Sequence, residues 1–123
     1  MSDYTDGFVL PLPKDKVDNY QKTAGLACKV WMEHGALDYR EWIIEDDKAE
    51  NMVTFPQLAG AREGETVVLA WITYKSREHR DEVNAKVMAD PRIKEMCPAN
   101  SEGPPPFDCS RMAYGGFTTL VKP

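Results

Sequence analysis

Few residues of this chain carry metal-binding or nucleophilic side chains. There are two histidines, His34 and His79, and three cysteines, Cys28, Cys97 and Cys109, and none of them forms an HxH, HExxH or CxxC motif. Zinc and non-haem iron need three or four converging ligands, so the sequence predicts no metal site and no cofactor. A single histidine such as His79 can hold haem, but nothing else in the sequence indicates one.

Hydrolytic and phosphate-binding motifs are also missing from the sequence. No GxSxG elbow carries a nucleophilic serine, and neither GxGxxG nor GxxxxGK occurs. Ser110 beside Arg111 is typical of a turn. The motifs therefore leave open whether the protein is an enzyme. The odd number of cysteines indicates reduced thiols in a cytoplasm, and Cys28 falls on the apolar side of a predicted helix as a small core residue.

The two histidines have different predicted roles. His79 lies one turn before Val83, on the helix face that should meet a sheet. It is either a half-buried residue that hydrogen-bonds a strand and holds the first turn of its helix, or a general base or polar contact at the edge of a pocket. His34 stands at the end of another predicted helix, where a positive charge complements the helix dipole.

A ligand pocket is predicted near the first turn of the second helix. The sequence places polar groups on otherwise apolar elements at His79, Tyr74 and Asp6, with Arg40 or Arg111 nearby, and small-molecule sites are apolar clefts with a few converging polar groups. A buried carboxylate needs a partner or water, so Asp6 either pairs with one of these arginines or faces a polar cavity. The competing interpretation is that the same groups satisfy one another in a closed core.

Two helices and four strands must position these residues. An apolar stripe at helical spacing runs from Val17 to Trp31, and Gly35 beyond it predicts a left-handed helix cap. Ser76 is a predicted N-cap for the second helix. The predicted strands cover residues 4–12, 37–44, 66–74 and 111–121, and the predicted helices cover residues 14–34 and 76–88.

The remaining segments are predicted to connect these elements. Residues 45–65 form a connection too long for a hairpin, with a short extended piece at 52–55, and its role is left open. Asp90-Pro91 is predicted to end the second helix, and residues 97–106 read as an irregular loop. In the last strand, the Gly115-Gly116 pair predicts a bulge or a close approach of the backbone.

The order of elements predicts an α+β fold with one domain over residues 1–123. Right-handed crossovers turn a βαββαβ order into a ferredoxin-like, four-stranded antiparallel sheet with two helices on one face. The strand at 66–74 is apolar on both faces, with Val67, Leu69 and Trp71 on one of them. Two helices cover only one face, so we expect a second copy to cover the other, in a homodimer. Most tryptophans and tyrosines then serve as core or interface residues rather than as a ligand cage.

Composition and charge exclude several classes of partner. The chain has 123 residues, a formal net charge of −5 and 42% hydrophobic residues, as is ordinary for a globular domain. An acidic chain without a basic patch repels phosphate backbones, so we expect no nucleic-acid partner. No apolar run is long enough to span a membrane, and the first residues do not resemble a signal peptide. We therefore expect a cytoplasmic protein.

Four segments carry a resemblance to a known family. DGFVLPLPKDK (6–16), KVWMEHGALDYRE (29–41), WITYKSREHRDEVNAKVMADPR (71–92) and PFDCSRMAYGGF (106–117) occur in order over nearly the whole chain. They resemble the YbaA-like family of uncharacterised bacterial proteins. The resemblance implies membership of the dimeric α/β-barrel superfamily, in which two ferredoxin-like sheets pack face to face.

The resemblance supplies no function, but it suggests where to look for one. Superfamily relatives include cofactor-independent monooxygenases and isomerases, which build cavities between helices and sheet. The leading hypothesis is therefore a dimer that binds a small molecule in such a cavity, with or without catalysis. The alternative is a non-catalytic homodimeric interaction or stress-associated module. An RNA-binding domain is less favoured, because the aromatic and basic pattern of such domains is missing.

Overall fold

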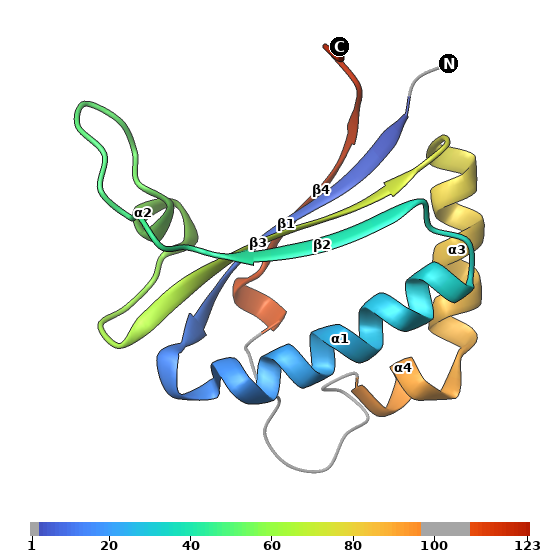
Figure 1. Cartoon of the computed structure of the whole chain (residues 1–123), viewed down its shortest axis with the longest axis horizontal. Coiled ribbons are helices and arrows are strands. Elements are labelled where there is room, and N and C mark those ends of the chain that lie inside the picture. Colours follow the sequence, from blue (N-terminus) through green and yellow to red (C-terminus); the bar gives the residue numbers. More distant parts are fainter. Residues whose placement is uncertain (1–2, 97–108) are drawn as a thin grey trace.

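An antiparallel four-stranded sheet with its two long helices packed on one face forms an α+β fold (Figure 1). The computed structural model describes residues 3–96 and 109–123. The strand order in the sheet is β2-β3-β1-β4. The strands are β1 (Tyr4–Pro13), β2 (Asp38–Ile43), β3 (Glu65–Tyr74) and β4 (Ala113–Thr118), and the helices are α1 (Val17–Glu33), α2 (Phe55–Ala59), α3 (Arg77–Ala89) and α4 (Pro91–Met96), with 3-10 turns at Lys14–Lys16 and Cys109–Arg111.

The two central strands have a buried face toward α1 and α3. β1 pairs with β3 along its whole length, with Asp6 opposite Ile72 and Leu10 opposite Val68. Because side chains alternate between the faces of a strand, these residues point to the same side, where all four are almost completely buried. Hydrophobic burial on this face holds the sheet to the helices. No helix within the described ranges is long and apolar enough to cross a membrane.

Helix α1 follows its predicted apolar stripe. The first predicted turn forms a 3-10 turn after Pro13, and the α-helix runs from Val17 to Glu33. Gly35 has a φ of 113°, a left-handed conformation that glycine adopts at low cost. The predicted helix cap is thus confirmed. It lets the chain turn back so that β2 can join the sheet beside β3.

Helix α3 starts at its predicted cap but does not end in a loop. The Ser76 hydroxyl oxygen accepts a hydrogen bond from the backbone N–H of His79 at 3.1 Å, as predicted. After Asp90, the chain enters α4, which was not predicted. Proline is favourable in the first turn of a helix, and the Asp90 side chain accepts a hydrogen bond from the backbone N–H of Arg92 at 2.9 Å. Asp90-Pro91 therefore ends one helix and starts another.

The long connection after β2 contains a short helix rather than a strand. The predicted extended piece at 52–55 forms no strand, and it ends earlier than predicted: Thr54 has an extended backbone, but α2 starts at Phe55. Thr54 forms a capping box with Gln57, in which each side chain accepts a hydrogen bond from the other residue's backbone N–H. Such a reciprocal pair satisfies two free donors at a helix start. Helix α2 packs against β1 and β3, and the segment projects beyond the end of the sheet (Figure 1).

The last strand is shorter than its predicted span of 111–121. The 3-10 turn takes up Arg111 at its start, and the chain leaves the sheet after Thr118. The pairing of β1 with β4 is continuous, which excludes a bulge at Gly115-Gly116. The predicted close approach is confirmed at Gly116, because a Cβ atom there would overlap the ring of Tyr4. The predicted loop at 97–106 lies outside the described residues.

Candidate functional site

Two neighbouring cavities lie between the helices and the covered face of the sheet. The larger has a volume of about 420 Å³ and the smaller about 360 Å³. Four residues line both cavities and so form the partition between them. The partition residues are Tyr20 and Ala24 on α1, and Tyr39 and Glu41 on β2.

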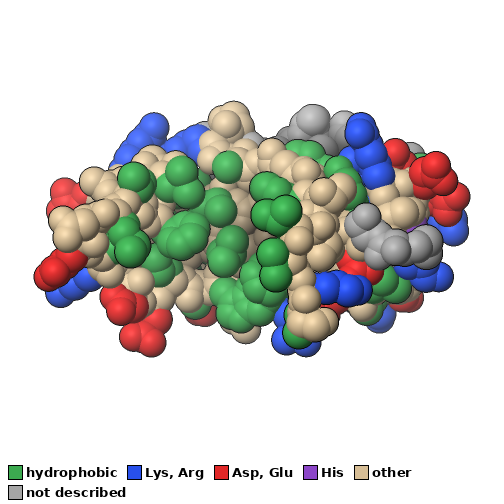
Figure 2. Space-filling model, turned by 90° about the horizontal axis from the view of Figure 1, so that it is seen from above, with side chains coloured by type: hydrophobic (Ala, Val, Ile, Leu, Met, Phe, Trp, Pro, Cys, Tyr) green, Lys and Arg blue, Asp and Glu red, His purple; other side chains and the backbone are tan. Residues whose placement is uncertain are grey.

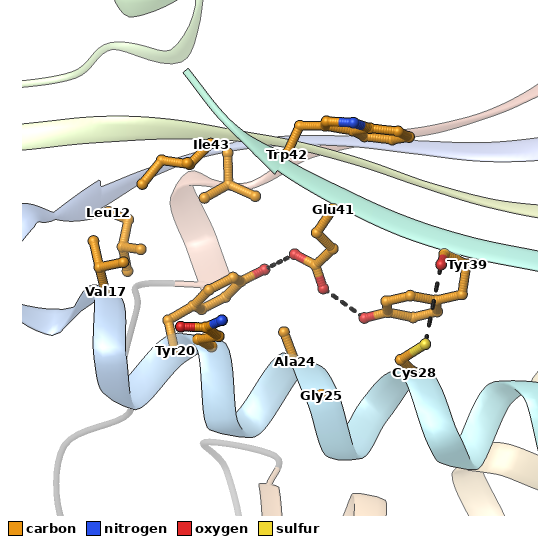
Figure 3. Close-up of a pocket in the computed structure, with 12 residues that line it drawn as sticks. Leu12, Val17, Tyr20, Ala24, Gly25, Cys28, Tyr39, Glu41, Trp42 and Ile43 are labelled. Atoms are coloured by element: carbon orange, nitrogen blue, oxygen red, sulfur yellow. Dashed lines mark hydrogen bonds between the residues drawn. The ribbon is translucent and has the colours of Figure 1, made fainter. Parts of the chain in front are cut away.

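A hydrogen-bonded bridge holds this partition together (Figure 3). The Tyr39 hydroxyl donates to Glu41 Oε2 at 2.6 Å, and the Tyr20 hydroxyl donates to Glu41 Oε1. Alternation along β2 places Tyr39 and Glu41 on the same face, and the helical stripe of α1 aims Tyr20 at them. Burial and the nearby Glu41 charge raise the pKa of Tyr39 well above its ordinary value of 10, so its hydroxyl stays protonated as a donor.

The second polar group of the larger cavity surrounds Asp6. Its side chain is almost fully buried and accepts a hydrogen bond from Arg80 Nη1 at 2.9 Å. Arg80 also donates to the Tyr114 hydroxyl, and its guanidinium lies 5.0 Å from the centre of the Tyr4 ring. Burial raises the pKa of Asp6 above 3.8, and the Arg80 charge offsets part of that effect.

Asn84 joins the Asp6 cluster to the aromatic wall of the cavity. Its Oδ1 atom accepts hydrogen bonds from Trp31 Nε1 at 3.2 Å and from the Tyr74 hydroxyl at 3.3 Å. Among the five residues predicted to form a pocket, Asp6 lines the larger cavity, while Tyr74 is fully buried behind it and reaches it through Asn84. Of the five predicted residues, Asp6 is thus the one whose side chain lines either of the two described cavities.

His79 occupies the corner between β3 and α3. Its Nδ1 atom accepts a hydrogen bond from the backbone N–H of Lys75 at 3.0 Å, and its ring meets Tyr74 edge-on with centres 5.9 Å apart. It is half-buried and does not line either cavity. This geometry matches the predicted structural role, in which the histidine holds the first turn of its helix.

The two arginines predicted to lie near Asp6 bind other carboxylates. Arg40 Nε lies 3.0 Å from Asp38, on the opposite face of β2 from Glu41. Arg111 Nη1 lies 2.7 Å from Glu65 and lowers the pKa of Glu65 to about 2. The prediction that one of them pairs with Asp6 is wrong. Strand alternation turns Arg40 away from the helices, and Arg111 lies beside Glu65 at the other end of β3.

His34 and Cys28, which the sequence analysis also considered, have structural neighbours. His34 Nε2 lies 2.9 Å from Asp90 Oδ2, so it bridges the end of α1 to the start of α4. Hydrogen bonds from Arg92 and His34 lower the pKa of Asp90. Cys28 lines the smaller cavity and is half-buried, and burial raises the pKa of its thiol. Within the described residues, no group of three or more His, Cys, Asp or Glu side chains is arranged to hold a metal ion.

Sequence reasoning missed the partition and the partner of Asp6. Arg80 and Asn84 lie on the second predicted helix, but nothing in the spacing of the sequence links them to Asp6, which is far away along the chain. No motif in the sequence singles out Glu41. The usable signal was its position two residues after Tyr39, which puts a carboxylate on the apolar, helix-facing side of β2.

These features define a small α+β protein with a largely apolar cavity between an antiparallel sheet and its helices. The chain belongs to the family described as "Protein of unknown function (DUF1428)", whose model matches residues 3–109. It is 41% identical over 118 residues to "Uncharacterized protein YbaA" of Escherichia coli strain K12, covering 96% of this chain and 97% of that protein. The protein of the same name from Shigella flexneri matches equally well. The predicted resemblance to YbaA is confirmed.

A likeness to a solved structure was also found. "De novo designed protein Foldit4" is 11% identical, with 98% of this chain and 99% of that chain covered and a TM-score of 0.43. At this TM-score the likeness is too low to define a shared fold.

Proposed function

We propose that this protein binds a small, largely apolar organic molecule in the larger cavity. The observation that carries the proposal is the cavity itself, whose volume of about 420 Å³ falls in the range of ligand sites, roughly 300–1,000 Å³. Apolar side chains form most of its wall, and polar groups gather around Asp6 and around Glu41. This combination is typical of sites that bind by burial and orient by a few hydrogen bonds. The apolar wall residues are Phe8, Leu10, Ala27, Ala70, Ile72, Met88, Ile93 and Met112.

A catalytic form of this proposal depends on Asp6. General acid–base catalysis needs a titratable group that reaches the bound molecule and has a pKa moved toward the working pH. Asp6 lines the cavity, and burial raises its pKa. A cofactor-independent proton transfer, as in an isomerase, is therefore the reaction class that this cavity favours, with the neighbouring Tyr114 as a second polar contact.

The binding proposal is tested with 1-hexanol as a neutral ligand. Titration of the 15N-labelled protein, followed by two-dimensional NMR, should give saturable shifts at Ala27, Ala70 and Met88. Ala24→Phe should weaken these shifts, because Ala24 lines both cavities and a phenyl group would obstruct the space where they meet. Ala85→Phe on the exposed side of α3 is the matched control and should bind as the parent does. Unsaturable shifts, or equal binding by Ala24→Phe, would contradict the proposal.

We also propose that two copies associate through the face of the sheet that the helices leave open, as in a dimeric α/β barrel. The strand order β2-β3-β1-β4 is the order expected of a ferredoxin-like sheet and supports this assignment. Figure 2 views the molecule from the side of the open face, where hydrophobic side chains gather in the middle and charged ones lie mainly toward the ends. Trp42 and Trp71 pack against each other there in a tilted arrangement, with ring centres 3.9 Å apart, and Phe117 is 61% exposed.

The connection between β2 and β3 extends this hydrophobic surface. Met52, Val53 and Leu58 are each at least 65% exposed, although they are apolar. Their segment projects past the end of the sheet on the open side (Figure 1). Large exposed apolar areas mark interaction sites, so a second copy seated on the sheet would also cover this segment. This gives the 45–65 connection a role in dimerisation.

A further inference from the structure

We propose that the molecule bound in the cavity is an organic amine whose cationic nitrogen lies against Glu41. This inference rests on the proposed function and names its ligand class. Glu41 stands at the partition, so an amine placed there would have its apolar body in the larger cavity and room for a second substituent in the smaller one. A primary or secondary aliphatic amine fits this arrangement.

The charges around the two cavities favour a cation. Asp6 and Glu41 are the charged residues among the lining side chains, and no lysine, arginine or histidine joins them in the described residues. An anionic ligand would therefore face two carboxylates and no lining cation. Opposite charges attract far more strongly in a partly buried site than in water, so the lining selects against acids and for amines.

Asp6 and Glu41 differ in how their charges are balanced. Asp6 has the Arg80 guanidinium at 2.9 Å as a counter-ion. Glu41 has no Lys, Arg or His nitrogen within 4.0 Å in the part of the chain that the structure describes, and its carboxylate is bound by the phenol hydroxyls of Tyr20 and Tyr39. Phenols satisfy its hydrogen bonds but leave its negative charge uncompensated. Glu41 is therefore the carboxylate that is available to a cation.

Aromatic side chains lie on both sides of Glu41 and hold it through hydroxyl groups that a ligand can replace. Tyr20 and Tyr39 contact the carboxylate, and the Trp31 ring lies 6.0 Å from that of Tyr39 and lines the larger cavity. The two tyrosines reach Glu41 through their hydroxyls, so an ammonium group that takes the place of the Tyr20 hydroxyl would donate a charge-assisted hydrogen bond to the carboxylate.

Three six-carbon ligands of different charge test this inference. NMR titration would compare hexylamine, 1-hexanol and hexanoate at pH 7, where the first is cationic and the last anionic. We expect hexylamine to bind about tenfold or more tightly than 1-hexanol, as a charge-assisted contact allows, and hexanoate to bind most weakly. The hexylamine shifts should centre on residues 39–41 and on Tyr20.

Matched variants separate a specific charge from general attraction to an acidic protein. Glu41→Gln keeps the size of the side chain and should reduce hexylamine binding to the level of 1-hexanol, with 1-hexanol binding unchanged. Glu45→Gln changes the net charge equally at an exposed position and should leave all three affinities as they are. Tyr20→Phe removes one phenol hydroxyl but keeps the carboxylate, so it should retain the preference for hexylamine. This variant tests the inference if Glu41→Gln does not fold.

The outcomes distinguish the two proposals. Equal binding of hexylamine and 1-hexanol, or an amine preference that survives in Glu41→Gln, overturns the amine inference and leaves the cavity-binding proposal standing. Loss of the preference in Tyr20→Phe also overturns it. If none of the three ligands binds at saturable sites in the cavity, both proposals fail together.

Discussion

Asp6 shows how strongly one buried carboxylate depends on one distant arginine. The two side chains are 74 positions apart in the sequence, and both are largely shielded from water, with 2% of Asp6 and 12% of Arg80 exposed. Removing one partner of a buried ion pair leaves a charge without compensation, which commonly costs roughly 3–5 kcal/mol. The pair therefore fixes the position of α3 against β1 as well as the polarity of the cavity.

Replacing Arg80 by methionine should lower the free energy of unfolding at pH 7 by about 3 kcal/mol or more. The loss should be smaller at acid pH. Burial already raises the pKa of Asp6 in the folded protein above 3.8, and loss of Arg80 would raise it further. A carboxyl group with a raised folded pKa stabilises the fold below its unfolded pKa, and this stability is lost as the pH rises through the folded pKa.

Urea unfolding of Arg80→Met and the parent between pH 3.5 and pH 8 measures this effect. Adding Asp6→Asn to Arg80→Met removes the stranded charge and should recover part of the stability at pH 7. Two results would show that Arg80 acts through packing and not through Asp6. One is a loss of unfolding free energy in Arg80→Met that stays constant with pH, and the other is a further loss when Asp6→Asn is added.

The glycines of two elements illustrate how the same change can have opposite effects. Gly116 on β4 lies against the ring of Tyr4, and an added methyl group would overlap that ring. Gly25 in the middle of α1 has open space around it, with nothing within 4 Å of an added Cβ atom. Neither glycine has a positive φ, so the difference between them is a matter of space and of helix propensity.

Gly116→Ala should destabilise the protein by roughly 1–3 kcal/mol, because overfilling a packed site forces its neighbours to move. Gly25→Ala should stabilise it by about 0.5–1 kcal/mol, since alanine costs less than glycine in a helix interior. Thermal unfolding of both variants gives the comparison. If Gly116→Ala unfolds at the parent's temperature, Tyr4 turns aside without cost and the close approach has no energetic role.

At the scale of elements, local patterns could predict the long helices and the central strands. The apolar stripe of α1, the Gly35 cap and the Ser76 cap each depend on residues within a few positions of one another. The short helices α2 and α4 were missed because their formation depends on capping pairs and prolines rather than on a periodic stripe. Only two or three residues, such as Thr54 and Gln57, carry that signal.

The candidate site could be predicted only in part, because its contacts join distant elements. Asp6 could be found, since a carboxylate in an apolar strand stands out. Its partner Arg80 could not be predicted, because the packing of α3 against β1 decides which arginine reaches Asp6. Glu41 meets Tyr20 across a gap of 21 residues. This contact depends on how α1 crosses β2, and the spacing of residues along the sequence does not predict that crossing.

At the scale of the whole molecule, the two faces of the sheet are in different environments. One face packs against α1 and α3, while helix α2 covers only the end of the other near Val67. Trp71 and Leu69 are half-buried on that open face, and Trp42 and Phe117 are exposed. Burial of such residues by a second copy would be favourable in proportion to the apolar area removed from water.

The proposed dimer should have twice the 13.9 kDa mass of the chain in light scattering at micromolar concentration. A stable interface buries about 1,600 Å² in total, and a charge placed inside it without a partner is costly. Phe117→Asp should therefore give a monomer. Phe117 is 61% exposed in the single chain, so the fold of the monomer should survive.

Leu26→Asp is the matched control for this prediction, because Leu26 lies on α1, on the helix side of the molecule, and is 37% exposed. It makes the same apolar-to-acidic change and should remain a dimer. Circular dichroism of both variants checks that they fold. A parent protein of 13.9 kDa at 100 μM would contradict the dimer, because burial of the open face between two copies would then be too weak to associate them. A Phe117→Asp protein that stays dimeric would place the interface on another surface.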